Sequence, residues 1–218
     1  MQILRNGTTV PGWRDAERAV AAALGGRAIE GKGVFDVLLP SLDHPLPYGL
    51  SIKTSKIQNE VWVLSELHNS SKKAHDHLDA LHIDWNIQPT EAGTALVEQV
   101  LGWHREVERS VDVRRSSYVH LVHDQKWQQW RLLWYPLDLL QPVGLDWVRV
   151  GARISAVTKD GHRLWEWYGA SGGQLKWYPK IADAKWDSGY FHLETPAPLK
   201  LRVKAADLFG QLWDNANA

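Results

Sequence analysis

The sequence predicts a mixed α/β fold, with a central mixed β-sheet flanked by helices and additional β-hairpins toward the C-terminus. In the first half, several stretches carry apolar residues at every third or fourth position, which is typical of amphipathic helices. In the second half, short runs rich in Val, Ile, Tyr and Trp are separated by turn residues, which is typical of strands. No repeat or long linker divides the chain, so we expect a single domain over residues 1–218.

The composition excludes several classes of protein. Twenty-five Lys and Arg residues balance 25 Asp and Glu residues, which argues against a protein that coats nucleic acid by charge alone. Cysteine is absent, which excludes disulfides, thiolate zinc sites and cysteine nucleophiles. No stretch approaches the roughly 18 apolar residues of a membrane span, and no secretion signal opens the chain. We therefore expect a cytoplasmic protein that does not contact a membrane.

The N-terminal elements place two acidic residues among apolar neighbours. A helix is predicted over residues 13–24, where Glu17 shares i, i+3, i+4, i+7 spacing with apolar residues and so lies on or beside the buried stripe. A short strand follows over 34–39, and its one acidic residue is Asp36. After a proline-containing turn, residues 48–55 are predicted to return as the next strand.

The later elements follow from the same periodicities. Three more helices are predicted over residues 57–67, 71–81 and 90–108. Strands are predicted over residues 118–122, 127–135, 149–158, 162–168, 174–178 and 190–193. Asp160-Gly161 is a strong hairpin signal between two of these strands.

One group of polar residues points to chemistry. A carboxylate such as Asp36 inside an apolar run is costly unless it is paired or binds a metal ion. On the returning strand, Ser51 and Lys53 alternate with Ile52, so they share a face that can meet Asp36. Asp36, the Ile52 carbonyl and Glu66 can supply hard oxygen ligands to a divalent cation. Lys53 beside that cation can orient an attacking water and stabilise charge on a phosphate.

The stretches GVFD, ending at Asp36, and GLSIK, ending at Lys53, resemble the PD-(D/E)xK nuclease superfamily. Ser51 stands where that motif usually has an acid, and Phe35 stands where it usually has proline. The serine resembles the branch of restriction endonucleases related to EcoRII and NgoMIV, in which a helix about a dozen residues later restores the carboxylate. Glu66 stands at that place.

The resemblance implies a fold, an activity and a set of site residues. The family core is a helix, a β-meander and a further helix, and the leading helix often supplies an extra glutamate. Glu17 is the first candidate for that glutamate and Glu30 the second. The implied protein is a Mg²⁺-dependent type II restriction endonuclease that cuts double-stranded DNA, with catalytic residues Asp36, Lys53, Glu66, Glu17 and Ser51. Cutting both strands predicts a homodimer, because each chain carries one active site.

Residues that read bases are expected next to the catalytic lysine. Lys56, Gln58 and Asn59 are the nearest side chains that can contact base edges or a phosphate. The arginines that read G·C pairs in the related branch are absent here, so its site preference does not carry over. Gln58 and Asn59 can equally be the start of a helix. Residues 159–163 and 171–176 form a second candidate set on hairpin tips.

Other interpretations remain open. In one, Asp36 caps a turn while Lys53 and Glu66 are solvated. In another, the Trp-rich segments 127–135 and 165–168 form a non-enzymatic module that stacks bases or sugars, although most of the 13 Trp residues are expected in the core. A repair or general nuclease of the same superfamily is a third. The histidine pairs are not spaced to share one face of a helix or strand, so we predict no histidine metal site.

Overall fold

The protein is described here by a computed structural model, which covers residues 2–3, 9–10, 12–31, 33–68, 70–140, 142, 144–169 and 173–193. The helices are α1 (Trp13–Ala23), α2 (Ser71–Ala80) and α3 (Pro89–Glu106), with 3₁₀ turns at Leu137–Leu140 and Ile181–Asp183. The strands are β1 (Gln2–Ile3), β2 (Thr9–Val10), β3 (Arg27–Ala28), β4 (Val37–Leu39), β5 (Tyr48–Lys56), β6 (Ser65–His68), β7 (Ser117–His123), β8 (Gln129–Pro136), β9 (Trp147–Val150), β10 (Arg153–Val157), β11 (Arg163–Trp167), β12 (Leu175–Trp177) and β13 (Trp186–His192).

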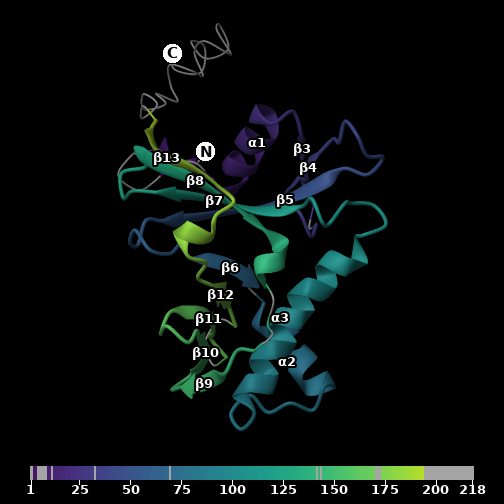
Figure 1. Ribbon diagram of the computed structural model, residues 1–218, viewed down its shortest axis with the longest axis vertical. Coiled ribbons are helices and arrows are strands. Elements are labelled where there is room, and N and C mark those ends of the chain that lie inside the picture. Colours follow the sequence, from purple (N-terminus) through teal and green to yellow (C-terminus); the bar gives the residue numbers. More distant parts are fainter. Residues whose placement is uncertain are drawn as a thin grey trace, which may run out of the picture.

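A six-stranded mixed sheet forms the centre of the molecule, in the order β13-β8-β7-β5-β4-β3 (Figure 1). Strands β3, β4 and β5 form an antiparallel meander, and β7 pairs with β5 in parallel. The parallel pairing requires a long crossover, which β6, α2 and α3 provide. Helix α1 covers one face of this sheet, where Val20 and Ala21 pack on Val37, Leu50 and Ile52.

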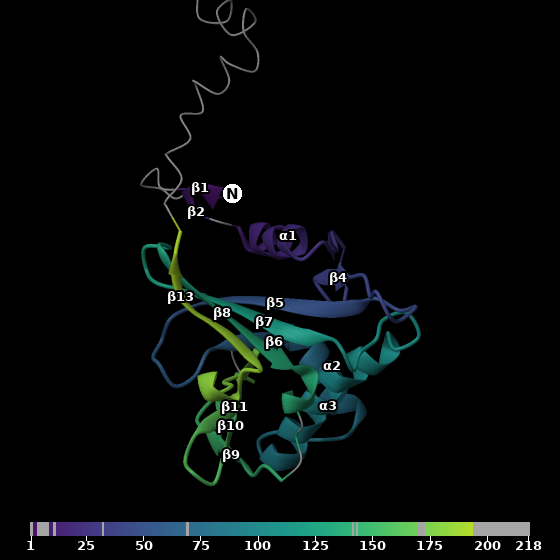
Figure 2. The same cartoon turned by 45° about the horizontal axis from the view of Figure 1, so that its top comes forward.

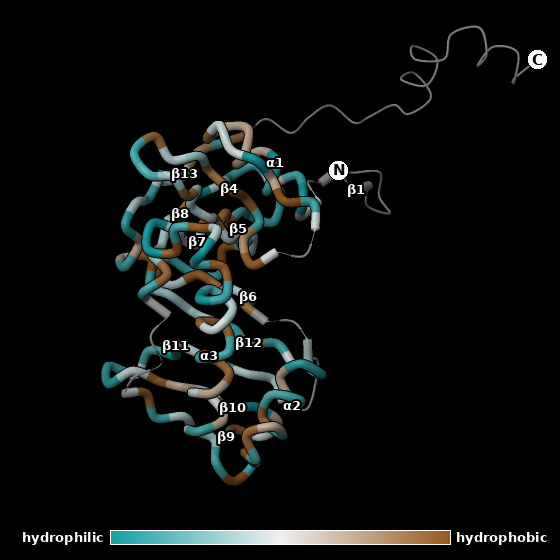
Figure 3. The backbone as a smooth tube through the Cα atoms, turned by 90° about the vertical axis from the view of Figure 1, so that its right-hand side faces the viewer, coloured by the Kyte–Doolittle hydropathy of each residue, from teal (hydrophilic) through white to brown (hydrophobic). Residues whose placement is uncertain are grey.

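A second sheet of five antiparallel strands, β6-β12-β11-β10-β9, lies on the other side of the central sheet from α1 (Figure 2). Its apolar face carries Trp165, Trp167 and Trp177, all fully buried in a cluster that also contains residues of α2, α3 and the central sheet. Figure 3 shows the central sheet with α1 at one end of the molecule and the second sheet with α2 at the other. This shared cluster makes both sheets parts of one core.

Close packing of α3 against the second sheet depends on one glycine. A Cβ atom at Gly93 would lie 2.0 Å from the indole of Trp147, a distance that no side chain can accept. Trp147 is 2% exposed, so this indole fills the space that Gly93 leaves open. Five tryptophans are buried, namely Trp130, Trp147, Trp165, Trp167 and Trp177. Three more, Trp85, Trp103 and Trp134, are partly buried and pack against the core, so eight of the 13 tryptophans of the sequence lie in it or against it.

The predicted mixed α/β class, the central mixed sheet and the C-terminal hairpins are confirmed. The helix predicted over residues 57–67 is wrong, because residues 57–64 contain no helix and Glu66 lies in strand β6. The Asn59 side chain accepts hydrogen bonds from the backbone N–H groups of Val61 and Trp62, which holds a turn there instead. Pairing with the distant β12 then makes the following residues a strand.

The strand predicted over residues 149–158 is also divided. Strands β9 and β10 are separated at Gly151, whose φ of 61° is accessible to glycine at little cost. The two strands pair with each other as a hairpin. No helix in the described part of the chain is long and apolar enough to cross a membrane.

Candidate active site

The candidate site begins where strand β4 ends. Strand β4 pairs with β5 only as far as Val37 opposite Leu50, and Asp36 is the residue just before it. The Asp36 carboxylate accepts a hydrogen bond of 2.7 Å from the Ile52 N–H and one of 3.3 Å from the Ser51 hydroxyl. Beyond the end of β4, the Asp36 carboxylate therefore accepts the β5 hydrogen bond that a continuing strand would have accepted with its backbone.

This arrangement also exposes a backbone carbonyl to the site. The N–H and C=O groups of one strand residue point to the same side of the strand. Because the Ile52 N–H reaches Asp36, the Ile52 carbonyl faces the same gap beyond β4. Asp36 thus contacts Ser51, as the sequence predicts. The Asp36 carboxylate and the Ile52 carbonyl both lie along the edge of β5 that β4 leaves uncovered.

Lys53 follows on β5 and is surrounded by acidic residues. Burial lowers the pKa of Lys53, while Asp36, Glu17 and Glu66 attract its ammonium and oppose that change, with Asp36 having the largest of the three effects. Lys53 stands beside His120 of the parallel strand β7. A lysine held in this way is a charged hydrogen-bond donor that is poised to give up a proton more readily than a solvated lysine.

Glu17 approaches the same place from α1. Glu17 is 7% exposed. Burial raises the pKa of its carboxyl group, and the negative charge of Asp36 raises that pKa further. Two carboxylates that face each other in a partly buried site repel unless a proton or a cation lies between them. Glu30 does not take this role, because it is bound by Arg14 and Arg18 at the surface.

Glu66 lies on the other side of Lys53. It stands opposite Lys176 of β12, with 3.8 Å between the Lys176 Nζ and the Glu66 Oε1, and its side chain is 46% exposed. Of the three carboxylates that act on Lys53, Glu66 has the smallest effect. Glu66 therefore reaches the site from a strand, and not from the helix on which the sequence predicted it.

The donors present fit one hard divalent cation. The described residues contain no group of three or more His, Asp or Glu side chains placed to hold a metal ion. The Asp36 carboxylate and the Ile52 carbonyl nevertheless lie on one edge of β5, and Glu17 is near enough for the Asp36 charge to raise its pKa. Mg²⁺ commonly binds one or two carboxylates and completes its shell with water and substrate phosphate, so this sparse oxygen set suits it.

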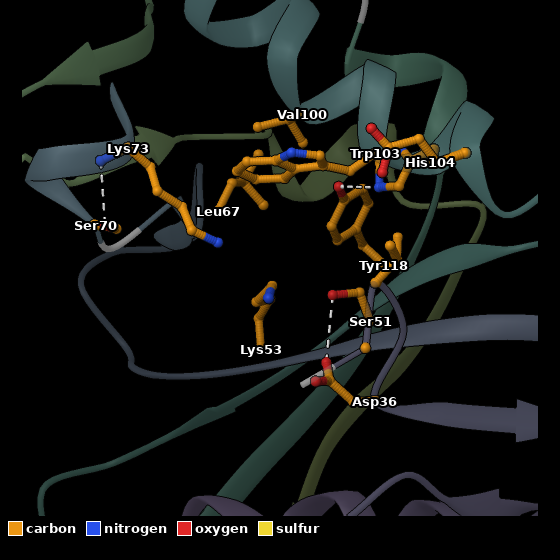
Figure 4. A pocket seen from close by; sticks show the side chains of 13 residues that line it. Asp36, Ser51, Lys53, Leu67, Ser70, Lys73, Val100, Trp103, His104 and Tyr118 are labelled. Carbon is orange, nitrogen blue, oxygen red and sulfur yellow. Dashed lines mark hydrogen bonds between the residues drawn. The ribbon is translucent and has the colours of Figure 1, made fainter. Parts of the chain in front are cut away.

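A cleft with a volume of about 430 Å³ opens over Asp36, Ser51 and Lys53, whereas Glu17 does not line it (Figure 4). Asp36, Ser51 and Lys53 form one side of it, and Trp103 from α3 and Lys73 from α2 are among the residues of the other. The sequence did not place Trp103 or Lys73 together with Asp36 and Lys53. Trp103 occupies an apolar position of its helix and Lys73 belongs to a short basic pair, and only the packing of α2 and α3 brings them over β5.

Two buried imidazoles, His104 on α3 and His120 on β7, lie near enough to Lys53 to be affected by its charge. The ring of His104 contacts the Tyr118 hydroxyl at 3.1 Å, and burial together with the Lys53 charge lowers the pKa of His104 to about 4. Burial and Lys53 likewise lower the pKa of His120 to about 3, and neither ring nitrogen of His120 has a partner among the described residues. Both rings are therefore neutral at pH 7 and add no positive charge beside Lys53.

A second hollow adjoins the cleft and shares Lys53 with it. Lys56, Gln58 and Glu66 are among the residues that line it. Gln58 is exposed, whereas the Asn59 carbonyl is engaged in holding its own turn. Neither residue starts a helix, so that alternative is wrong. Of the second candidate set, residues 171–172 lie outside the described part of the chain.

Comparison of the chain with models of known protein families, with curated proteins and with solved structures finds no match in any of the three.

Proposed function

We propose that this protein is a Mg²⁺-dependent nuclease that hydrolyses phosphodiester bonds of DNA. The observation that carries the proposal is the Asp36 carboxylate, hydrogen-bonded to the backbone N–H of Ile52 beside the half-buried Lys53. Two further features support it. Glu17 adds a second carboxylate from α1, and α1, the β3–β4–β5 meander and α3 follow in the order that the family resemblance implies.

Each residue has a defined part in the proposed reaction. Asp36, Glu17 and the Ile52 carbonyl would hold Mg²⁺, which supplies positive charge to the scissile phosphate and to the attacking water. Ser51 donates to the Asp36 carboxylate and fixes its orientation. Lys53 donates hydrogen bonds to a phosphate oxygen and to the attacking water, where negative charge develops in the transition state.

The specific form that we propose is a type II restriction endonuclease acting on double-stranded DNA. The direct test is incubation of the folded protein with plasmid DNA, with and without Mg²⁺, followed by sequencing of the cut ends. Discrete fragments are expected, and only with Mg²⁺. A smear would indicate a general or repair nuclease of the same superfamily instead. Absence of cleavage of any DNA would refute the nuclease proposal.

The contributions of Glu17 and Glu66 can be separated by the dependence of the rate on Mg²⁺. Glu17→Gln should raise the Mg²⁺ concentration needed for half-maximal rate by at least about tenfold, because it removes a carboxylate beside Asp36. Glu66→Gln should raise it less, since Glu66 lies nearer Lys176 and acts weakly on Lys53. The reverse order would show that Glu66 is the second metal ligand, as the resemblance implies.

Gln58 is the residue that we expect to contact bases. It is exposed and lies in the hollow next to Lys53, so Gln58→Ala should cost about 1–3 kcal/mol at one position of the recognition site and relax the preference there. Lys56→Ala, the matched change at the end of β5 in the same hollow, should weaken binding to all sequences alike. The measurement is cleavage of a randomised site library, and an unchanged preference in Gln58→Ala would exclude this residue from base reading.

We further propose that two copies of the chain act together on a duplex, related by a twofold axis. We expect the protein to elute as a dimer when cognate DNA is present in a sizing experiment. A monomer both with and without DNA would instead indicate that the two strands are nicked one after the other.

A further inference from the structure

The cleft over the candidate site is covered on the side opposite the catalytic residues. Figure 4 shows Asp36, Ser51 and Lys53 on one side, with the Trp103 indole across from them and Lys73 entering from α2. A volume of about 430 Å³ lies at the lower end of the range for sites that hold one small ligand. The space beneath α3 therefore suits a single nucleotide.

The wall formed by α3 is apolar and aromatic. The indole of Trp103 is partly buried, and Leu67 and Val100 lie beside it in the cleft. Aromatic faces bordered by apolar side chains bind nucleic-acid bases by stacking, with little dependence on which base is present. This wall thus offers a surface for the face of a base.

Two cations lie between the indole and the carboxylates. The Lys73 Nζ is 6.0 Å from the centre of the Trp103 ring, and Lys53 lies on the facing strand. Lys72, the neighbour of Lys73 in sequence, is paired with Asp76 at 2.6 Å. Lys73 forms no such ion pair within the described residues, so its charge is available to a ligand in the cleft. The cations are placed to bind a phosphate whose base reaches Trp103.

We propose that the cleft binds one unpaired nucleotide, with its base stacked on Trp103 and its phosphate held by Lys73 and Lys53. This inference rests on the proposed nuclease function, and it replaces the fully paired duplex of the restriction-enzyme form with a substrate that is unpaired at the cut. A base whose face stacks on Trp103 cannot remain paired and stacked inside a duplex, so the nucleotide must be single-stranded or displaced from the helix. The adjoining hollow, which shares Lys53, receives the next nucleotide of the same strand. The preferred substrate is therefore DNA that is unpaired at the position of cleavage.

The test compares three end-labelled oligonucleotides that contain the same strand. One is single-stranded, one is fully paired, and one is a duplex with a single unpaired nucleotide at the cleavage position. The strand with an unpaired nucleotide should be cut at least tenfold faster than the fully paired duplex. Equal rates on the paired and unpaired substrates, with Trp103→Ala cutting as fast as the wild-type protein, would overturn the inference and leave the nuclease function standing.

Variants locate the effect in the cleft. Trp103→Ala should weaken binding of the single strand about 10- to 100-fold, measured by fluorescence anisotropy without Mg²⁺, and Trp103→Phe should retain most of it. Lys73→Gln should weaken binding, whereas Lys72→Gln on the exposed face of the same helix should not. If Trp103→Ala does not fold, as judged by circular dichroism, the two lysine variants decide the question, and equal affinities for them would overturn the inference.

The binding measurements also separate this inference from the nuclease proposal. Binding of the single strand that depends on Trp103 and Lys73, without any cleavage in Mg²⁺, would refute the nuclease and retain the nucleotide site. Cleavage in Mg²⁺ that is unchanged in the Trp103 and Lys73 variants would retain the nuclease and refute the nucleotide site.

Discussion

Replacement of Lys53 by alanine is expected to lower the rate of DNA cleavage by about 10²–10³-fold and to leave the fold intact. Lys53 shares the cleft with Asp36, and Asp36 has the strongest effect on it of the three surrounding carboxylates. Without Lys53, charge that develops on the phosphate loses a donor in a partly buried, weakly screened environment. The loss should appear in the rate of bond cleavage at saturating DNA and not only in affinity.

The measurement is single-turnover cleavage in Mg²⁺, with circular dichroism to establish that the variant is folded. Lys126→Ala is a suitable control, because Lys126 is an exposed lysine in the turn between β7 and β8. It should cleave at the wild-type rate. A Lys53→Ala protein that cleaves as fast as Lys126→Ala would remove Lys53 from the mechanism and with it the principal support for the proposed function.

Some parts of the site were predictable because their signals are local. Ser51 and Lys53 share a face since strand side chains alternate, and the turn that precedes β5 brings that face to Asp36. The helical stripe predicts Glu17 as a partly buried acid, and the Asp36 charge indeed raises its pKa, whereas Glu30 is bound by arginines at the surface. Each of these inferences required only the periodicity of one element and the short connection to the next.

Other parts depend on contacts between distant segments. Glu66 lies on a strand because β6 pairs with β12, more than a hundred residues later, and no local pattern in residues 57–67 encodes that pairing. Short apolar runs fit a helix or a strand equally well until a partner strand is known. Trp103 is likewise an ordinary apolar position of a helix until α3 is placed across β5. Sequence periodicity identified the elements, whereas their packing determined which side chains face the cleft.

The second sheet contains a buried carboxylate, and its removal should strongly lower the stability of the fold. Glu166 is completely buried and forms ion pairs with Arg153 at 3.0 Å and Arg163 at 3.1 Å. The Tyr178 hydroxyl donates to it at 2.9 Å. Burial alone would raise the pKa of Glu166, but hydrogen bonds from Tyr168 and Tyr178 and the two arginines more than offset this and lower it.

Glu166→Gln should therefore reduce the free energy of unfolding by about 2–3 kcal/mol at pH 7, because it leaves two arginines without their counter-charge. Glu60 provides a matched control. It also binds an arginine and a tyrosine, Arg131 and Tyr190, but its side chain is 66% exposed. Glu60→Gln should cause a clearly smaller loss, since solvent screens exposed ion pairs. Equal losses in urea denaturation would show that burial does not strengthen the Glu166 network.

The pH dependence gives an independent check on the same network. A carboxyl group with a lowered pKa in the folded state stabilises the protein fully above its unfolded pKa, which is about 4.3 for glutamate. That contribution is lost as the pH falls through the lower pKa of the folded state. The difference in stability between the wild-type protein and Glu166→Gln should thus be constant from pH 7 to about pH 5 and shrink at lower pH. A difference that instead grows on acidification would mean that Glu166 is already protonated in the folded protein at neutral pH, and that the arginines are held by other partners.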